Sequence, residues 1–128
     1  MTNPEIKKLL RKGKILFANE KYKDALSCFS KALISDPNNQ DVLIHLGYTN
    51  SALGNLDEAV ECIEKVKETK EDLFDFWNDI GRSYQLLKEY KKAIYAFKNA
   101  LENDPAEIQK ELIEATIEHL SLKANYNQ

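Results

Sequence analysis

The sequence predicts an all-α protein made of three copies of one helical repeat followed by a C-terminal tail. The first observation is a recurrence at an interval of 34 residues, which places Gly13, Gly47 and Gly81 in register. The second is the presence of only four Gly and three Pro in 128 residues, which favours long helices joined by short turns. The third is the helical spacing of the apolar residues within each copy. The core is therefore expected to lie between helices.

The same interval relates residues of similar type elsewhere in the copies. Ala25, Ala59 and Ala93 occupy one small-residue position. Further slots hold Leu9, Leu43 and Trp77; Leu16, Asn50 and Tyr84; Phe29, Ile63 and Phe97; and Ala32, Val66 and Ala100. The copies end near Pro37, Glu71 and Pro105.

Each copy is predicted to be a pair of helices. In the first, Thr2 or Asn3–Pro4 begins a helix that ends at the turn of residues 19–21, and a second helix covers residues 22–35. Two antiparallel helices joined by so short a turn form a hairpin that leaves apolar surface uncovered. The next hairpin is expected to cover it.

The boundaries between copies carry stop and cap signals. Proline ends a helix, and the Asp and Asn residues of segment 36–39 can cap the next one. Because Glu71 replaces proline at the second boundary, the preceding helix is free to run on through residues 67–70, with Asp72 as the next cap.

This pattern resembles the tetratricopeptide repeat family. The third copy is the most similar, with Trp77, Ile80, Gly81, Tyr84, Ala93, Phe97, Ala100 and Pro105 at the matching positions. The resemblance covers about residues 5–105 and implies a right-handed superhelical stack, an α-solenoid of three antiparallel hairpins. The implied repeats are about 5–38, 39–72 and 73–105, in a single domain spanning residues 1–128. It also implies that each glycine faces the alanine of the partner helix (Ala25, Ala59 or Ala93).

A seventh helix is expected at about residues 106–124. Ile108, Leu112 and Ala115 form one apolar stripe on it, and Ile113, Ile117 and Leu120 form another. In the family such a helix closes the open end of the stack. Two stripes are more than one covering face needs, so self-association through this helix stays open. Met1 and the closing helix lead us to expect a complete small protein.

Charge and cysteine content limit the range of possible functions. Residues 1–38 hold eight Lys and Arg against four Asp and Glu, and residues 39–71 hold three against seven. Such charges either solvate the helix faces or steer an acidic partner to one end. Cys28 and Cys62 occupy equivalent positions on second helices, where the expected spacing of about 8–10 Å is too long for a disulfide. We expect free thiols and a cytoplasmic protein.

No motif for catalysis, a cofactor or a metal ion is present in the sequence. His45 and His119 are interpreted as exposed or partly packed helix residues rather than ligands or catalytic bases. No run approaches the roughly 20 apolar residues of a membrane span. Nucleic acid is disfavoured because the net charge is −3 and acidic residues accompany the basic ones. We therefore expect no enzyme, no cofactor and no membrane partner.

With these functions disfavoured, the remaining interpretation is a surface that binds another protein. The resemblance implies a concave groove, lined by the first helix of each hairpin, that receives a peptide or a partner helix. Its residues are Lys7, Leu10, Lys14, Phe17, Asp41, Ile44, Tyr48, Ser51, Asp75, Asn78, Arg82 and Gln85. For Leu10, Phe17 and Ile44, core packing is the alternative. Lys14, Tyr48 and Arg82 are expected to form a row in which two cations flank an aromatic ring.

Two functions follow from these patterns. The first is a non-catalytic scaffold or adaptor that binds a segment of another protein in its groove. The alternative is a structural subunit that associates with itself, as a weak homo-oligomer, through the C-terminal helix.

We predict that the acidic C-terminal tail of chaperones does not bind. Relatives that bind this tail hold two carboxylates with Lys, Asn, Asn, Lys and Arg, whereas the matching positions here are Leu10, Lys14, His45, Asp75 and Asp79. Asp75 and Asp79 occupy the positions of the last two cations and would repel the carboxylates of the tail. Isothermal titration with such a peptide should give no dissociation constant at or below roughly tens of micromolar; tighter binding would contradict this.

Overall fold

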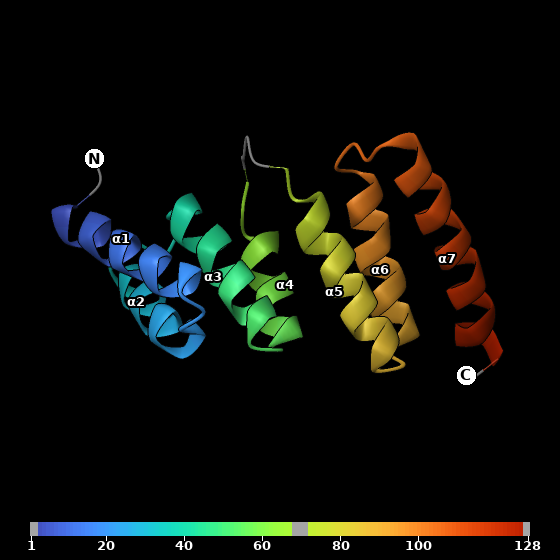
Figure 1. The fold of residues 1–128 in the computed structure, drawn as a ribbon, viewed down its shortest axis with the longest axis horizontal. Coiled ribbons are helices and arrows are strands. Elements are labelled where there is room, and N and C mark those ends of the chain that lie inside the picture. The colour runs from blue at the N-terminus through green and yellow to red at the C-terminus, as the bar shows by residue number, and fades with distance from the viewer. Residues whose placement is uncertain (1–2, 68–71, 127–128) are drawn as a thin grey trace. The chain divides into compact units, whose positions relative to one another are not determined.

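The computed structural model describes residues 3–67 and 72–126 and has seven α-helices and no strand among them (Figure 1). The chain separates into two compact units, Met1–Thr69 (unit 1) and Lys70–Gln128 (unit 2), and each is described by itself. The predicted all-α class, with three hairpins and a seventh helix, is confirmed. The grouping of residues 1–128 into one domain stays a prediction.

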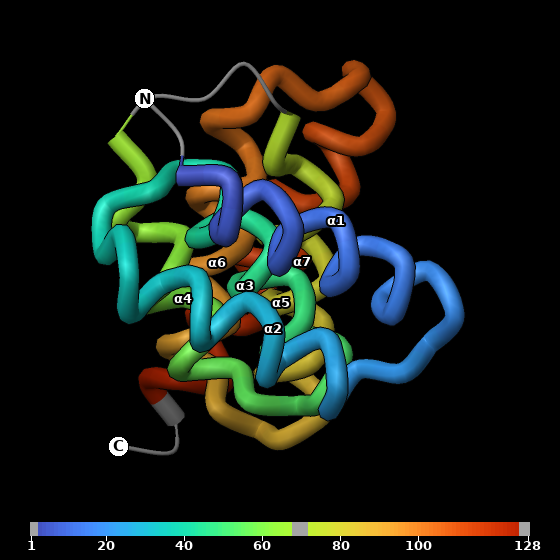
Figure 2. Tube along the Cα trace, turned by 90° about the vertical axis from the view of Figure 1, so that its left-hand side faces the viewer, coloured from blue at the N-terminus to red at the C-terminus, as the bar shows by residue number. Residues whose placement is uncertain are grey.

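The seven helices form three hairpins and a final helix. Unit 1 contains α1 (Pro4–Ala18), α2 (Tyr22–Ser35), α3 (Gln40–Ala52) and α4 (Leu56–Glu64), and unit 2 contains α5 (Phe74–Leu86), α6 (Tyr90–Leu101) and α7 (Glu107–Tyr126). Within each unit, consecutive helices pack against each other. Figure 2 faces unit 1 and shows α1 and α2 lying side by side.

Asparagine caps begin two helices of unit 1. The Asn3 side chain accepts a hydrogen bond from the Glu5 amide at 2.8 Å, and Pro4 occupies the first helical position, where a missing N–H costs nothing. The Asn39 side chain accepts from the Val42 amide at 3.1 Å. The predicted start of the first helix and the cap of the third are therefore confirmed.

The boundary after α4 differs from the prediction. The helix ends at Glu64, so the predicted continuation of the helix is wrong at Lys67. The rest of that continuation, residues 68–70, lies outside the described residues. The Lys67 amide instead donates to the Gln40 Oε1 atom at 2.8 Å, at the start of α3, which directs the chain away from the helix axis. The Asp72 carboxylate accepts from the Phe74 amide at 2.8 Å, but the N-cap residue of α5 is Leu73, so the expected cap is displaced by one position.

The glycines in the first helix of each hairpin contact large side chains. A methyl group at Gly13 would lie 2.5 Å from Cε1 of Phe29, and one at Gly81 would lie 2.7 Å from Cε1 of Phe97. At Gly13 and Gly81 the large side chain is therefore nearer than the alanine that the resemblance implies. At Gly47, Cδ1 of Ile63 lies 2.8 Å from the methyl position, and the Ala59 carbonyl oxygen is more distant, at 3.4 Å. The large residue of the second helix lies across the backbone of the first.

The final helix buries one of its two apolar stripes. Ile113 and Leu120 are 6% and 0% exposed, in the face that packs on α6. Ile108 and Leu112 are 70% and 64% exposed. The helix therefore covers α6 as predicted, and its other stripe faces outward.

Both cysteines are free, as expected, with Cys28 buried and Cys62 half-buried. Burial raises the pKa of the Cys62 thiol above its usual value, against a smaller opposing effect of the Lys65 ammonium. A neutral, partly covered thiol is a poor nucleophile. The structure therefore keeps Cys62 in a packing role.

The turn inside each hairpin contains a residue in the left-handed backbone region. These residues are Glu20 (φ 61°), Gly54 (φ 81°) and Lys88 (φ 62°), which are again 34 positions apart. The following amides donate to Leu16, Asn50 and Tyr84 carbonyls at 2.8–2.9 Å and close the first helix. Only the second hairpin uses glycine, the residue for which this conformation is unstrained.

We predict that Glu20→Gly stabilises the protein. Left-handed backbone costs a residue with a side chain roughly 1–2 kcal/mol, and the greater freedom of unfolded glycine offsets about half of that. The free energy of unfolding should rise by about 0.5–1 kcal/mol in denaturant titrations. Lys31→Gly, in the exposed interior of α2, is the control and should lower it by a similar amount. A loss of stability in Glu20→Gly would show that the turn is not strained.

Candidate peptide-binding hollow

The predicted groove residues of unit 1 have different environments. Lys7, Lys14 and Asp41 are exposed, and Phe17, Tyr48 and Ser51 are half-buried. Leu10 and Ile44 are only 8% and 4% exposed, so their inclusion in a binding surface was wrong and the alternative of core packing holds. Phe17 packs edge-on against the Tyr22 ring, with the centroids 5.2 Å apart.

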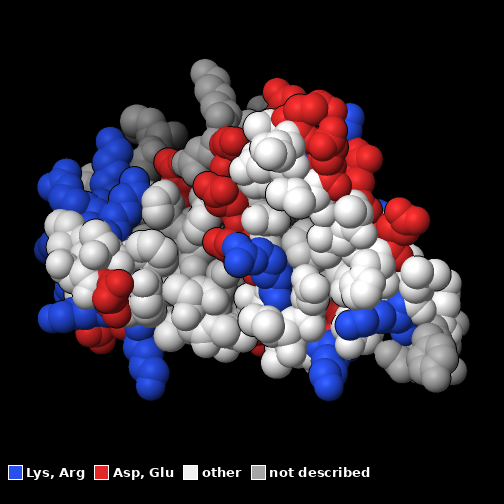
Figure 3. Space-filling model, turned by 45° about the vertical axis from the view of Figure 1, so that its right-hand side comes forward, with Lys and Arg blue, Asp and Glu red and all other residues white. Residues whose placement is uncertain are grey.

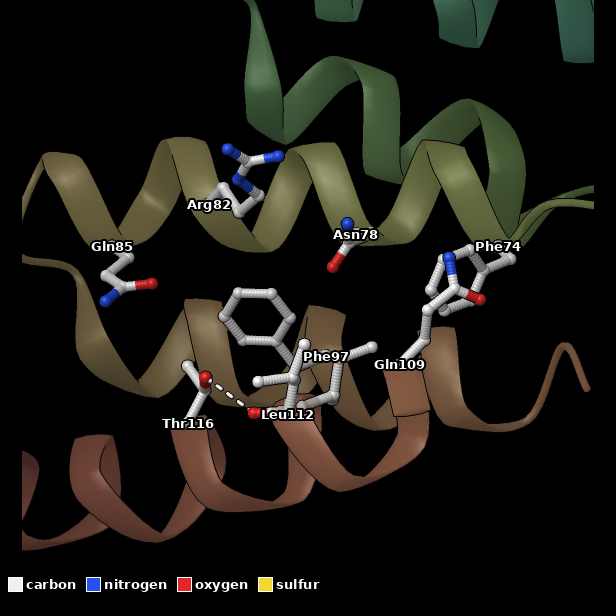
Figure 4. A pocket seen from close by; sticks show the side chains of 9 residues that line it. Phe74, Asn78, Arg82, Gln85, Phe97, Gln109, Leu112 and Thr116 are labelled. Atoms are coloured by element: carbon white, nitrogen blue, oxygen red, sulfur yellow. Dashed lines mark hydrogen bonds between the residues drawn. The ribbon is translucent and has the colours of Figure 1, made fainter. Parts of the chain in front are cut away.

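In unit 2 the predicted residues meet the final helix. α5 and α7 lie on either side of α6 and run in the same direction (Figures 1 and 4). Between them lies the α5–α7 hollow, with a volume of about 290 Å³. It is lined by Phe74, Asn78, Arg82 and Gln85 of α5, Phe97 of α6, and Gln109, Leu112, Ile113 and Thr116 of α7. Asp75 is exposed on α5 and does not line it.

The hollow has an apolar floor and a polar rim. Figure 4 shows Asn78 and Gln85 extending from α5 toward α7, with the Phe97 ring between the two helices. Leu112 extends toward that ring and Gln109 toward Phe74. An apolar side chain entering the hollow would contact Phe97 and Leu112, while the amides of the rim could hydrogen-bond a backbone.

A second depression continues from the first at the carboxyl ends of α5 and α7. It has a volume of about 410 Å³ and is lined by Arg82, Gln85, Leu86, Lys88, Tyr90 and Lys123. We call it the basic end of the hollow. The Lys123 ammonium lies over the Tyr90 ring, 5.6 Å from its centroid. Leu86 is 84% exposed and adds an apolar wall.

The opposite end of unit 2 is acidic. Asp72 and Asp75 lie at the start of α5, and Glu107 and Glu111 lie in the first turns of α7. Figure 3 shows acidic side chains gathered over the first part of α7. None of these acidic residues lines either depression, whereas Arg82, Lys88 and Lys123 line the basic end. The charged side chains that line the hollow are therefore positive and lie toward the carboxyl ends of the two helices.

Arg82 also affects a carboxylate of its own helix. Burial raises the pKa of Asp79 above its ordinary value, the Arg82 guanidinium opposes this, and Asp75 adds to it. In Figure 4 the guanidinium is turned away from Phe97. Arg82 must therefore rotate to reach a ligand in the hollow, and its exposed position permits this.

The sequence predicted one wall of this hollow and missed the other. Asn78, Arg82 and Gln85 were expected, but α7 was interpreted as a cover or a self-association surface and not as a wall of the groove. Gln109, Leu112, Thr116 and Lys123 recur at intervals of three, four and seven residues, which places them on one helix face. That spacing was the available signal. The row of Lys14, Tyr48 and Arg82 draws on both units and stays a prediction.

The described residues contain no group of three His, Cys, Asp or Glu side chains placed to bind a metal ion. Among them, no helix is long and apolar enough to cross a membrane. His45 packs against the Phe29 ring, with the centroids 5.6 Å apart, and its Nδ1 atom lies 2.7 Å from the Asp41 carbonyl oxygen. It is partly packed, as expected.

Comparison with known proteins identifies the family. Two models described as "Tetratricopeptide repeat" match residues 16–77 and 74–106. The chain belongs to the tetratricopeptide repeat family. DnaJ homolog subfamily C member 3 of Gallus gallus is 34% identical over 106 residues, which are 81% of this chain and 20% of that protein. The chain thus spans about a fifth of the length of this relative.

Solved structures confirm the fold. The Sgt2 TPR domain from Aspergillus fumigatus is 25% identical, with a TM-score of 0.65, over 97% of this chain and 83% of that one. The first TPR of Spaghetti (RPAP3), bound to the HSP90 peptide SRMEEVD, is 17% identical, with a TM-score of 0.68, over 98% and 97% of the two chains. The family, together with the Sgt2 domain, indicates a protein–protein interaction scaffold or adaptor.

We predict that Arg82→Gln raises the pKa of Asp79 further. Removing the guanidinium removes the effect that opposes burial, so the carboxylate should bind its proton at a higher pH. Carbon-13 NMR of the Asp79 carboxyl group during a pH titration measures this. Lys98→Gln, an equal charge change on α6, should leave it unaltered. An unshifted titration in Arg82→Gln would mean that the two side chains do not interact.

Proposed function

We propose that this protein is a non-catalytic adaptor whose α5–α7 hollow binds a segment of another protein through an apolar side chain. The observation that carries the proposal is the combination of an apolar floor and a rim of amides in one open depression. Three of its residues, Asn78, Arg82 and Gln85, are ones that the family resemblance assigns to a peptide groove.

The open form of the hollow favours a side chain of a polypeptide over a small molecule. Small-ligand pockets typically bury roughly 70–90% of the ligand surface, whereas this depression of about 290 Å³ is open to solvent along its length and continues into the second one. A polypeptide can place one anchor in such a depression and gain further contacts along the adjoining surface. Exposed Leu86 and Leu112 provide such apolar contact area.

The rim supports recognition of a backbone. Asn78 and Gln85 carry both donors and acceptors, which match the alternating N–H and C=O groups of an extended chain. Gln109, whose Oε1 atom accepts from the Ala106 amide at 3.1 Å, adds the donors of its NH₂ group. The side chains at the rim are exposed or half-buried and therefore accessible. We propose that the accessible groove positions of unit 1, such as Lys14 and Tyr48, form a protein-binding surface of that unit. We also propose a cytoplasmic site of action, which the two free cysteines support.

We predict that Leu112→Asp reduces partner capture by more than about tenfold. A carboxylate beside the Phe97 ring disfavours an apolar anchor, and loss of a central anchor typically costs 2 kcal/mol or more. Tagged protein is incubated with extract of its native cells, and bound proteins are measured by quantitative mass spectrometry. Leu122→Asp, at a 68% exposed position of the same helix, is the matched control and should retain the partners.

Two results bear on this interpretation. Thermal unfolding of Leu112→Asp should resemble that of Leu122→Asp, because both leucines are exposed. Equal recovery of every partner by the two variants would remove the α5–α7 hollow from the proposed function.

A second candidate is self-association through α7. Ile108, Leu112 and Leu122 are 64–70% exposed on one face of the helix, which is unusual for apolar residues of this size. We predict that, if this face joins two copies, light scattering will show a mass that rises with concentration and falls in Leu122→Asp. A monomer at high concentration eliminates this candidate.

A further inference from the structure

We propose that the basic end of the hollow binds an acidic side chain of the same partner segment whose apolar side chain enters the α5–α7 hollow. This inference rests on the proposed function and adds the chemistry of the partner: an apolar anchor with an Asp or Glu at a defined distance from it. The residues assigned to the carboxylate are Lys88 and Lys123, with Arg82 between the two depressions.

The two depressions form one continuous surface. Arg82 and Gln85 line both of them, so a segment seated between α5 and α7 reaches the basic end without leaving the protein surface. Because α5 and α7 run in parallel, their carboxyl ends lie together at this end (Figure 4). The acidic residue of a bound segment is therefore expected here, whichever way the segment runs.

The cations at this end are held in place and available. Lys123 lies over the Tyr90 ring, which restricts its ammonium to the depression. The Lys88 amide donates to the Gln85 carbonyl at 3.0 Å, and the Glu89 amide donates to the Tyr84 carbonyl at 2.9 Å, so the backbone that carries Lys88 is held on both sides. Neither lysine forms an ion pair with a carboxylate of the described residues.

Nearby acidic groups do not cancel this charge. Glu89 lies beside Lys88, but its carboxylate is 3.4 Å from the Lys92 ammonium. The Arg82 guanidinium is turned away from Phe97 in Figure 4, which leaves the two lysines as the principal ligands. The carboxyl end of α5 carries partial negative charge, and the amino end of α6, which begins at Tyr90, carries partial positive charge at the same place. The helix dipoles therefore largely offset each other.

The positions of the cations determine where the partner's carboxylate lies. No acidic residue of the described part of the chain lines either depression, and Lys88 and Lys123 line only the second, so the apolar anchor and the acidic residue are separated along the groove. Eleven positions separate Leu112 from Lys123 on α7, a rise of about 16 Å at 1.5 Å per residue. An extended chain covers this distance in about five residues. The reach of the lysine side chains shortens the expected spacing to about three to five residues.

This site differs from the arrangement that holds chaperone tails in the family. None of Lys88, Tyr90 or Lys123 is at one of the five matching positions, and two of those positions here are Asp75 and Asp79. The proposed acidic ligand is therefore held at the other end of the third hairpin and by the closing helix.

The test starts from a library of displayed random peptides, selected on the full 128-residue chain and on two variants. Lys88→Gln/Lys123→Gln removes the proposed site. Lys91→Gln/Lys98→Gln makes the same charge change at exposed positions of α6 that line neither depression. Wild type and the α6 control should select peptides with an aliphatic or aromatic residue and an Asp or Glu three to five positions away. The Lys88/Lys123 variant should keep the apolar preference and lose the acidic one.

Affinities then quantify the contact. A selected peptide and its Glu→Gln twin are compared by fluorescence anisotropy at low and high salt. Partly exposed ion pairs contribute about 0.2–1 kcal/mol each, so the two lysines together should favour the Glu peptide about five- to tenfold at low salt. The ratio should fall toward one at high salt and in the Lys88/Lys123 variant.

Lys88→Gly separates a binding effect from a folding effect. It relieves the left-handed backbone strain at φ 62° and should therefore raise the free energy of unfolding while lowering the affinity for the Glu peptide about two- to fivefold. Its affinity for the Gln twin should not change. Weaker binding in a more stable protein cannot be attributed to misfolding.

Three results would overturn the inference. Selected peptides without acidic enrichment, or an equal Glu preference in the Lys88/Lys123 variant, would refute the carboxylate site while leaving the proposed function intact. Displacement of the Glu peptide from this end by an oligouridine at equal concentration would assign the end to nucleic acid instead. Retention of no peptide, or of the same peptides by Leu112→Asp, would refute the proposed function itself and the inference with it.

Discussion

The close approach between each first-helix glycine and the large side chain of its partner helix determines the geometry of the hairpins. At Gly81 there is no room for even a methyl group, because the Phe97 ring occupies that space. Glycine inside a helix costs about 1 kcal/mol relative to alanine, and burial of an aromatic ring against the exposed backbone compensates for this. The same arrangement recurs with Phe29 at Gly13 and, with a smaller side chain, Ile63 at Gly47.

This contact also connects the fold to the binding surface. Phe97 contacts Gly81 and lines the α5–α7 hollow, so one residue supports the hairpin and forms part of the floor. α7 buries Ile113 and Leu120 when it packs on α6, and this places Leu112 and Thr116 at the opposite wall. The hollow thus arises because α5 and α7 both pack on α6 and leave a space between them. A partner side chain can occupy the remaining space.

Local signals account for most of what was predictable. Asn3 and Asn39 act as caps because a side-chain acceptor near unpaired amides is a short-range arrangement that the sequence displays directly. The prediction failed at the end of α4. There the chain leaves the helix at Glu64, and the Lys67 amide donates to Gln40, a residue 27 positions away that no local pattern identifies. The burial of Leu10 and Ile44 is likewise a result of packing between helices.

The sequence by itself determined the repeat, the helices and the first wall of the candidate site, because an interval of 34 residues and a helical spacing of apolar side chains are properties of the chain alone. The tertiary structure decided which face of α7 is buried, since Ile113 and Ile108 are equally apolar and only packing against α6 distinguishes them. It also brought Lys88 and Lys123 to one depression from positions far apart in the chain. Charges separated in sequence act together only when the fold places them on the same surface.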